Sequence, residues 1–180
     1  MKLQKKFYDT GDKKDKQTYA DTTFKKEWEL DLGDEKIKAF HFGSAHTEGD
    51  AFIHFQNANV VHMGDLVFNR RYPYMDRPAG CTVTGLIDYL DKVIQMFQKD
   101  TMFIFGHAIS DDYVTGKIED VVRMKDYFSA LRDFMINEVK AGKSFKEIEK
   151  AKFVPSFEKL PERYDGEKNN NLKAAYEEFS

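Results

Sequence analysis

The chain has 180 residues and a formal net charge of −3. This length suits one domain with a substantial core, and sixteen Phe and nine Tyr argue against intrinsic disorder because such side chains are mostly buried. The weak negative charge, with no basic stripe along the sequence, excludes the electrostatic surface that nucleic-acid binding needs.

The N-terminal stretch is charged and aperiodic. We expect residues 1–21 to form a flexible or loosely docked lead-in, followed by a single domain over residues 22–180. The lead-in is too polar for a secretory signal, and no apolar run reaches the roughly 18 residues that span a bilayer. As written, the chain is therefore expected in the cytoplasm and away from membranes, unless a longer native N-terminus carried a signal.

Short strand-like runs broken by turn residues come next. Trp28–Leu32 and Ile37–Phe42 flank a Gly-Asp turn, and Ala51–Phe55 and Val60–Met63 flank a Gln-Asn-Ala-Asn turn, so each pair predicts a hairpin. The aperiodic stretch 69–80 predicts a loop.

Helical periodicity begins after this loop. Apolar residues at three-to-four spacing predict a helix over 84–98 with Thr84 as its N-cap, and the apolar run Met102–Phe105 predicts a strand. A long helix is expected from Val114 to Val139, with Gly142 as its C′ glycine.

The C-terminal region predicts two further helices. Ser144 and Glu147 have the spacing of a capping box at the start of a helix over 144–152, and a loop over 153–171 precedes a helix over 172–179. Strands first, then helices with one more strand, predict an α/β protein (α+β by some schemes) with helices on one face of a sheet.

Three residues with metal-ligand chemistry share one structural context. His46, Asp65 and His107 each follow a predicted strand and each have a glycine nearby. Side chains that follow strands can converge at one sheet edge. Two imidazoles and a carboxylate are ligand types that zinc accepts. Each motif alone is more typical of an ordinary loop than of a metal site.

Their order resembles the C-terminal half of the metallo-β-lactamase superfamily. The stretches HTEGDAFIHF, VVHMGDLVFNRRYPYMD and MFIFGHA carry the resemblance. It implies an αββα sandwich with a metal site along one edge of its two sheets. It also implies that His46 is the third ligand of the first metal, that Asp65 bridges both metals, and that His107 binds the second.

The leading motif of that family, His-x-His-x-Asp-His, is absent. Only His41 precedes His46, and no second His or Asp stands near it at the required spacing. We therefore expect a partial, truncated sandwich in which zinc binds weakly or incompletely, since catalytic zinc has about three protein ligands.

Other polar residues have simpler interpretations. His41, His54 and His62 lie within predicted strands and are expected to be hydrogen-bonded, with His62 also a candidate neighbour of the metal ligands. Asp50 either orients the His46 loop or stabilises a turn. We expect Arg70 and Arg71 to form a solvated pair on an exposed loop, with binding of an anionic substrate as the alternative. Cys81 is expected to be an inert thiol.

Two functions remain open. One is a metal-dependent hydrolase in which metal-activated water attacks an ester, thioester or amide-type bond of a small-molecule substrate. The other is a non-catalytic remnant that acts by association. In both, a bare inner sheet face predicts a homodimer or a complementing N-terminal half. This face is expected to draw, in some alternation, on Phe40, Phe42, Phe52, Ile53, Val60, Val61 and Phe105.

Overall fold

The computed structural model describes Ala20 and residues 22–180, so the predicted lead-in over 1–21 lies outside the described residues apart from Ala20. The strands are β1 (Glu27–Asp31), β2 (Lys36–Phe40), β3 (Phe52–Phe55), β4 (Val60–His62), β5 (Phe68–Asn69), β6 (Met102–Ile104), β7 (His107–Ala108) and β8 (Thr115–Gly116). The helices are α2 (Val83–Met96), α3 (Ile118–Lys140), α4 (Phe145–Ile148) and α5 (Glu167–Phe179), with short 3-10 helices η2 (Gly64–Leu66), η3 (Arg77–Ala79) and η4 (Asp111–Tyr113).

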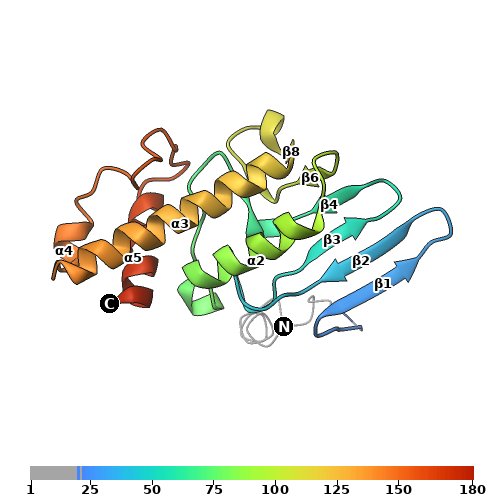
Figure 1. The fold of residues 1–180 in the computed structure, drawn as a ribbon, viewed down its shortest axis with the longest axis horizontal. Coiled ribbons are helices and arrows are strands. Elements are labelled where there is room, and N and C mark those ends of the chain that lie inside the picture. The colour runs from blue at the N-terminus through green and yellow to red at the C-terminus, as the bar shows by residue number, and fades with distance from the viewer. Residues whose placement is uncertain (1–19, 21) are drawn as a thin grey trace, which may run out of the picture.

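The strands form a six-stranded sheet with the order β1-β2-β3-β4-β6-β8 and a two-stranded sheet of β5 and β7 (Figure 1). Both predicted hairpins are confirmed, because β1 pairs antiparallel with β2 and β3 pairs antiparallel with β4. β6 lies parallel to β4, and α2 provides the crossover that a parallel pair requires. The result is a mixed α/β protein, as predicted.

The helix α2 is confirmed, but its N-cap is Thr82 and not Thr84. Thr82 Oγ1 accepts a hydrogen bond from the Gly85 N–H at 3.0 Å. Thr84 instead donates its hydroxyl to Glu178 Oε1 at 2.7 Å, a contact with the last turn of α5. Local sequence allows either threonine as the cap, and packing against α5 selects the first.

The long helix α3 begins at Ile118, four residues later than predicted. The apolar periodicity extends back to Val114, but the backbone there is used by the sheet: the Phe105 N–H donates to the Val114 carbonyl at 2.8 Å, and β8 pairs with β6. The predicted helix end is confirmed, since Gly142 has φ +76° and donates to the Val139 carbonyl at 2.9 Å.

Of the last two helices, α4 is shorter than predicted and α5 is longer. The capping box of Ser144 and Glu147 is confirmed, but α4 ends at Ile148. The terminal helix α5 begins at Glu167 and includes the Asn run that the sequence assigns to a loop. Asn171 is buried there, where it accepts from the Tyr127 hydroxyl at 2.8 Å and donates to the Pro73 carbonyl at 2.7 Å. These tertiary hydrogen bonds outweigh its weak helix propensity.

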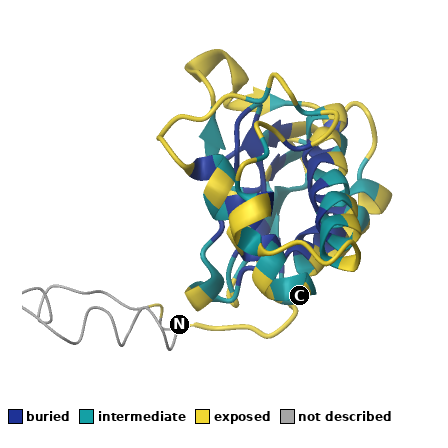
Figure 2. Cartoon of the chain, turned by 90° about the vertical axis from the view of Figure 1, so that its left-hand side faces the viewer, coloured by how far each residue is buried: buried dark blue, intermediate teal, exposed yellow. Residues whose placement is uncertain are grey.

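Alternate residues of the strands point to two different faces of the large sheet. We call the face toward the helices the covered face; Phe52 on it contacts Tyr89 of α2, with ring centroids 6.2 Å apart. Phe97, at the end of α2, lies 5.8 Å from Phe52 and 5.9 Å from Phe103. Figure 2 shows this buried layer between strands and helices. Its core positions from the strands are Phe40, Phe52, Val61 and Phe103.

We call the other side the open face. Leu30 and Met102 on it remain 41% and 45% exposed. The strand register also assigns it Trp28, Ile37, Ala39, Ile53, Phe55, Val60, His62 and Ile104. Apart from Leu30 and Met102, the apolar side chains of this face are half-buried or, like Ala39, buried. The predicted membership was partly wrong: Phe40, Phe52 and Val61 lie on the covered face, Phe42 contacts Tyr89 on that side, and Phe105 is buried.

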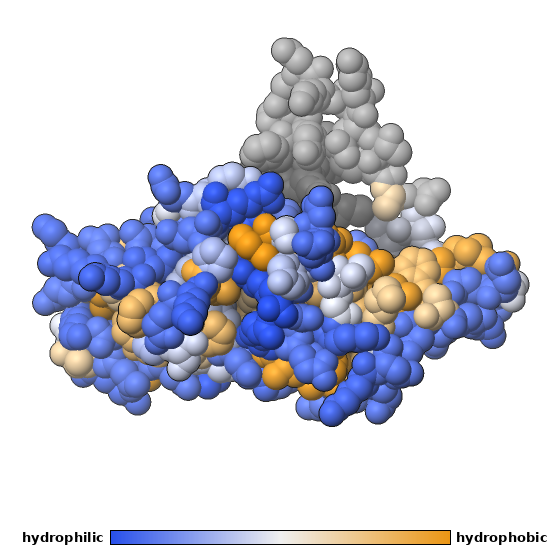
Figure 3. All heavy atoms as spheres, turned by 90° about the horizontal axis from the view of Figure 1, so that it is seen from above, coloured by the Kyte–Doolittle hydropathy of each residue, from blue (hydrophilic) through white to orange (hydrophobic). Residues whose placement is uncertain are grey.

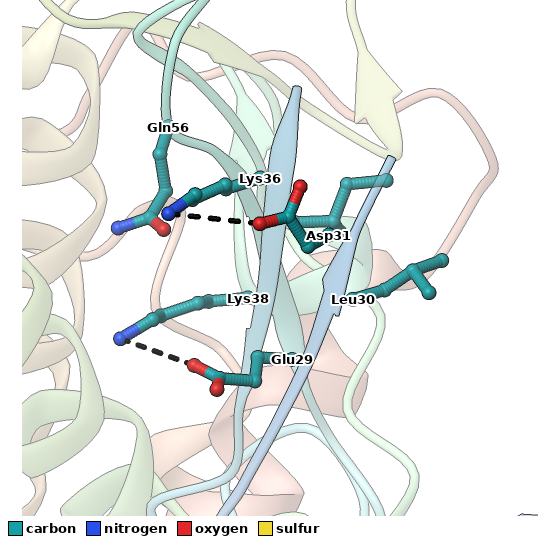
Figure 4. A pocket seen from close by; sticks show the side chains of 7 residues that line it. Glu29, Leu30, Asp31, Lys36, Lys38 and Gln56 are labelled. Carbon is teal, nitrogen blue, oxygen red and sulfur yellow. Dashed lines mark ion pairs between the residues drawn. The ribbon is translucent and has the colours of Figure 1, made fainter. Parts of the chain in front are cut away.

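The outer hairpin displays this alternation directly. In Figure 4, Leu30 points away from the side on which Lys36 pairs with Asp31 and Lys38 pairs with Glu29, each at 3.6 Å. Hydrophobic residues gather on the strand half of the surface, at the right of Figure 3. None of the described helices is both long and apolar enough to cross a bilayer.

Candidate metal centre

The three candidate ligands come together. His46 Nε2 lies 3.7 Å from Asp65 Oδ2, and His107 Nε2 lies 3.4 Å from Asp65 Oδ1. Each imidazole therefore faces a different oxygen of one carboxylate. His46 is buried, whereas the side chains of Asp65 and His107 are partly exposed.

Strand direction explains this convergence. Because β2, β4 and β6 run the same way, their carboxyl ends meet at one edge of the sheet. His62 of β4 pairs with Ile104 of β6, and Asp65 and His107 each stand three positions beyond these partners. His46 lies in the loop that follows β2.

The loop of His46 is held by Asp50. Asp50 Oδ2 accepts from the Thr47 N–H, and Asp50 Oδ1 accepts from the Thr47 hydroxyl, both at 2.8 Å. The Glu48 N–H donates to the Ala79 carbonyl at 2.9 Å, which ties the loop to the segment ahead of α2. Asp50 therefore has both of the roles considered for it: it stabilises a turn, and through that turn it orients the loop that carries His46.

Two glycines allow the Asp65 loop to approach the His107 loop. Gly64 has φ +53°, and the Gly106 N–H donates to its carbonyl at 2.8 Å. A Cβ added to Gly106 would lie 2.6 Å from that carbonyl oxygen and would also overlap Asp65 Oδ1. No other residue fits at position 106 without moving the carboxylate.

Phe68 provides an apolar support for both imidazoles. Its ring stacks on His107 with centroids 4.5 Å apart at 24°, and it lies 5.6 Å from the ring of His46. Phe68 is buried, and its strand β5 pairs with β7, which carries His107. Sequence reasoning missed this role, although Phe68 lies three positions after Asp65.

A cavity of about 240 Å³ opens beside these residues. One end is formed by His46, Asp65, Phe68 and His107. The rest is lined by residues that sequence reasoning did not place there, from the loop after β5 and from the segment leading into α5: Arg71, Tyr74, Arg163, Tyr164 and Glu167.

The interpretation of Arg70 and Arg71 as a solvated pair was wrong for Arg71. Arg71 is 2% exposed and forms an ion pair with the buried Glu167, ninety-six positions away. Arg70 is partly exposed and lies 3.4 Å from Asp120. The buried charge of Arg71 needs a partner, because an unpaired buried charge costs several kcal/mol. No local signal in the sequence identifies Glu167 as that partner.

The remaining histidines and the cysteine have structural contacts. His41 Nδ1 lies 2.6 Å from the Asp50 carbonyl oxygen, and His54 contacts the Phe97 ring edge-on at 4.9 Å. His62 Nδ1 accepts from the Gly64 N–H at 3.1 Å, next to Asp65. Cys81 is buried, and desolvation raises the pKa of its thiol to about 12, which disfavours the reactive thiolate.

The donor set fits a bridged pair of ions only in part. One imidazole and one carboxylate oxygen face each of two positions, and the described residues contain no group of three or more His, Cys, Asp or Glu side chains placed to hold one ion. A stable zinc site has about three or four protein ligands. The described residues therefore do not by themselves form the ligand set of a stable zinc site.

Comparison with known proteins finds similar folds among solved structures. No protein-family model and no curated protein sequence matches the chain. Among solved structures, a double mutant of the sec-alkyl sulfatase PisA1 superposes with a TM-score of 0.67 at 16% identity, over 87% of this chain and 26% of the sulfatase. A metallo-β-lactamase from Pontibacter korlensis gives 0.53 at 13% identity, over 64% of this chain and 52% of the enzyme. The metallo-β-lactamase DIM-1 gives 0.52 at 17% identity, with 65% and 52% covered.

Proposed function

We propose that this chain, which has the metallo-β-lactamase fold over part of that domain, supplies metal ligands to the active site of a metal-dependent hydrolase. The chain spans about a quarter of the sulfatase and about half of each β-lactamase that it matches. The observation that carries the proposal is the Asp65 carboxylate, which lies between the imidazoles of His46 and His107 at 3.7 and 3.4 Å.

In this proposal His46, Asp65 and His107 would hold the zinc, with one imidazole on each side of the Asp65 carboxylate. When bound, zinc supplies a water molecule acidified toward neutral pH for attack on an ester, thioester or amide-type bond. The residues of the chain hold the geometry: Asp50 fixes the His46 loop, and Phe68 restricts both imidazole rings. The adjacent cavity receives a small substrate.

Further donors must come from outside the described residues, because those residues offer only two for each ion. We propose that they arrive with a partner that covers the open face, either a second copy or an N-terminal half. Sheets pack face to face at about 10 Å, and soluble monomers rarely expose an apolar face of this kind. Leu30 and Met102 are the most exposed apolar side chains on that face.

Metal binding by the purified chain tests the proposal. After chelator treatment, equilibrium dialysis against zinc should give weak, saturable binding that Asp65→Asn lowers by at least about tenfold. The matched control is Asp91→Asn, because the Asp91 side chain on α2 is 46% exposed, against 45% for Asp65, and does not line the cavity. Binding that Asp65→Asn leaves unchanged would contradict the assignment and favour a non-catalytic remnant.

Light scattering on the same samples tests the partner. We expect a dimer, or a monomer that associates when an N-terminal half of the fold is added. A stable monomer that binds neither would show that the open face needs no partner.

A further inference from the structure

The cavity beside Asp65 has a second wall that the metal proposal does not use. This wall joins the loop after β5, which carries Arg71 and Tyr74, to Arg163 and Tyr164 in the segment ahead of α5 and to Glu167, the first residue of α5. Two of the five residues are cationic, two are phenols and one is a carboxylate. The net charge that a ligand meets at this wall therefore depends on whether Glu167 is already paired within the protein.

Glu167 is already satisfied by the protein. Its Oε1 pairs with the Arg71 guanidinium, and its Oε2 accepts from the Arg163 backbone N–H at 2.7 Å. Both of its partners belong to the wall, so Glu167 joins the two segments. The pair Arg71–Glu167 is almost fully buried, which makes it an anchor for the wall and leaves its negative charge neutralised.

Arg163 has no such partner. Among the described residues, no carboxylate lies within 4.0 Å of its side chain, and its guanidinium carbon lies 5.6 Å from the ring centroid of Tyr164. Arg71 is 2% exposed, and its guanidinium is paired with Glu167. With Glu167 neutralised, this wall carries one net positive charge, on Arg163, while the Asp65 carboxylate carries a negative charge at the other end of the cavity.

We propose that this wall binds a small oxyanion group of the substrate, such as a carboxylate, sulfate or phosphate. Arg163 is its main ligand, since a guanidinium binds such groups through two parallel hydrogen bonds, and the hydroxyls of Tyr74 or Tyr164 can add a donor. The inference rests on the proposed function for one point: the bond to be cleaved lies at the other end of the cavity, near His46, Asp65 and His107. A cavity of about 240 Å³ limits the substrate to a small molecule.

Anion binding can be measured without metal. Equilibrium dialysis of the chain against radiolabelled sulfate, in a chelator and at constant chloride concentration, should show one saturable site per chain. Arg163→Gln should weaken binding by at least about tenfold, because it removes both charge-assisted hydrogen bonds of the guanidinium. Arg163→Lys keeps the charge but loses the fork, and should fall between the two. Arg132→Gln is the matched control, because Arg132 is a partly exposed arginine of α3 paired with Asp133 and absent from the cavity lining.

Sulfate binding that Arg163→Gln and Arg132→Gln lower equally would overturn the proposal, as would the absence of a saturable site. Circular dichroism of each variant verifies that the fold is kept. The result is independent of metal ligation: zinc binding without sulfate binding would remove this inference and leave the proposed function standing. Sulfate binding without zinc binding would do the reverse.

Discussion

The two faces of the six-stranded sheet are built from alternate residues of the same strands, and both are apolar near the centre. On the covered face, Phe52 and Phe103 are fully buried by Tyr89 and Phe97. On the open face, Ile53 and Ile104 are only half-buried, although each is the chain neighbour of a core residue. Apolar residues thus lie on both faces of the sheet, but only the covered face packs against the helices of the described chain.

This comparison bears on the function. The candidate metal centre sits at the edge where the carboxyl ends of β2, β4 and β6 meet, so a partner on the open face would lie beside it. The partner proposed above would thus cover the open face and could also bring the further metal ligands that the proposal requires.

The largest expected effect is a difference in unfolding free energy between alanine variants of two neighbouring residues, Phe52 and Ile53. Phe52→Ala, on the covered face, should lower the free energy of unfolding by about 3–5 kcal/mol, because it leaves a cavity in the core. Ile53→Ala, on the open face, should cost about 1 kcal/mol or less, since its side chain is already half-solvated. Urea unfolding at concentrations where the chain is monomeric measures both. Equal losses would mean that the open face is packed within the chain itself.

Charge on the open face should act on association. Met102→Lys is expected to weaken association through the open face by about tenfold or more, while the unfolding free energy of the monomer changes by no more than about 0.5 kcal/mol. Met96→Lys is the control, because Met96 is 42% exposed on α2 and Met102 is 45% exposed on β6. Light scattering over a concentration series compares the two, and an equal loss of association would place the interface elsewhere.

The smallest effect concerns pH. His54 lies on the covered face beside Phe97, where desolvation lowers its pKa below the ordinary value of 6.5. The unfolded chain therefore takes up the proton first, so the folded state loses stability as the pH falls below about 6.5. His54→Leu should flatten this dependence between pH 7.5 and pH 5. Unfolding curves across that range are the measurement, and an unchanged slope would show that His54 does not contribute.

Much of this architecture was predictable from local patterns. Turn residues between apolar runs predicted both hairpins, the periodicity of Leu86, Leu90 and Val93 predicted α2, and Gly142 marked the end of α3. His46, Asp65 and His107 each follow a strand, which predicted that they would meet at one edge of the sheet. Each of these signals is encoded within a few residues, or in strand direction, and needs no knowledge of distant contacts.

Other features were decided only by tertiary structure. The Asn run joins α5 because Asn171 finds Tyr127 and Pro73, and Val114 leaves the helical pattern because its carbonyl accepts from Phe105. Arg71 is buried because Glu167 lies opposite it.

The sequence by itself therefore determined the two hairpins, most of the helices and the order of the candidate ligands. The tertiary structure alone decided which alternate residues of each strand face the helices, and which distant segment completes the cavity. The physical reason is the same in each case: a buried polar or apolar group is stabilised by its partner, and here the partner lies tens of residues away along the chain.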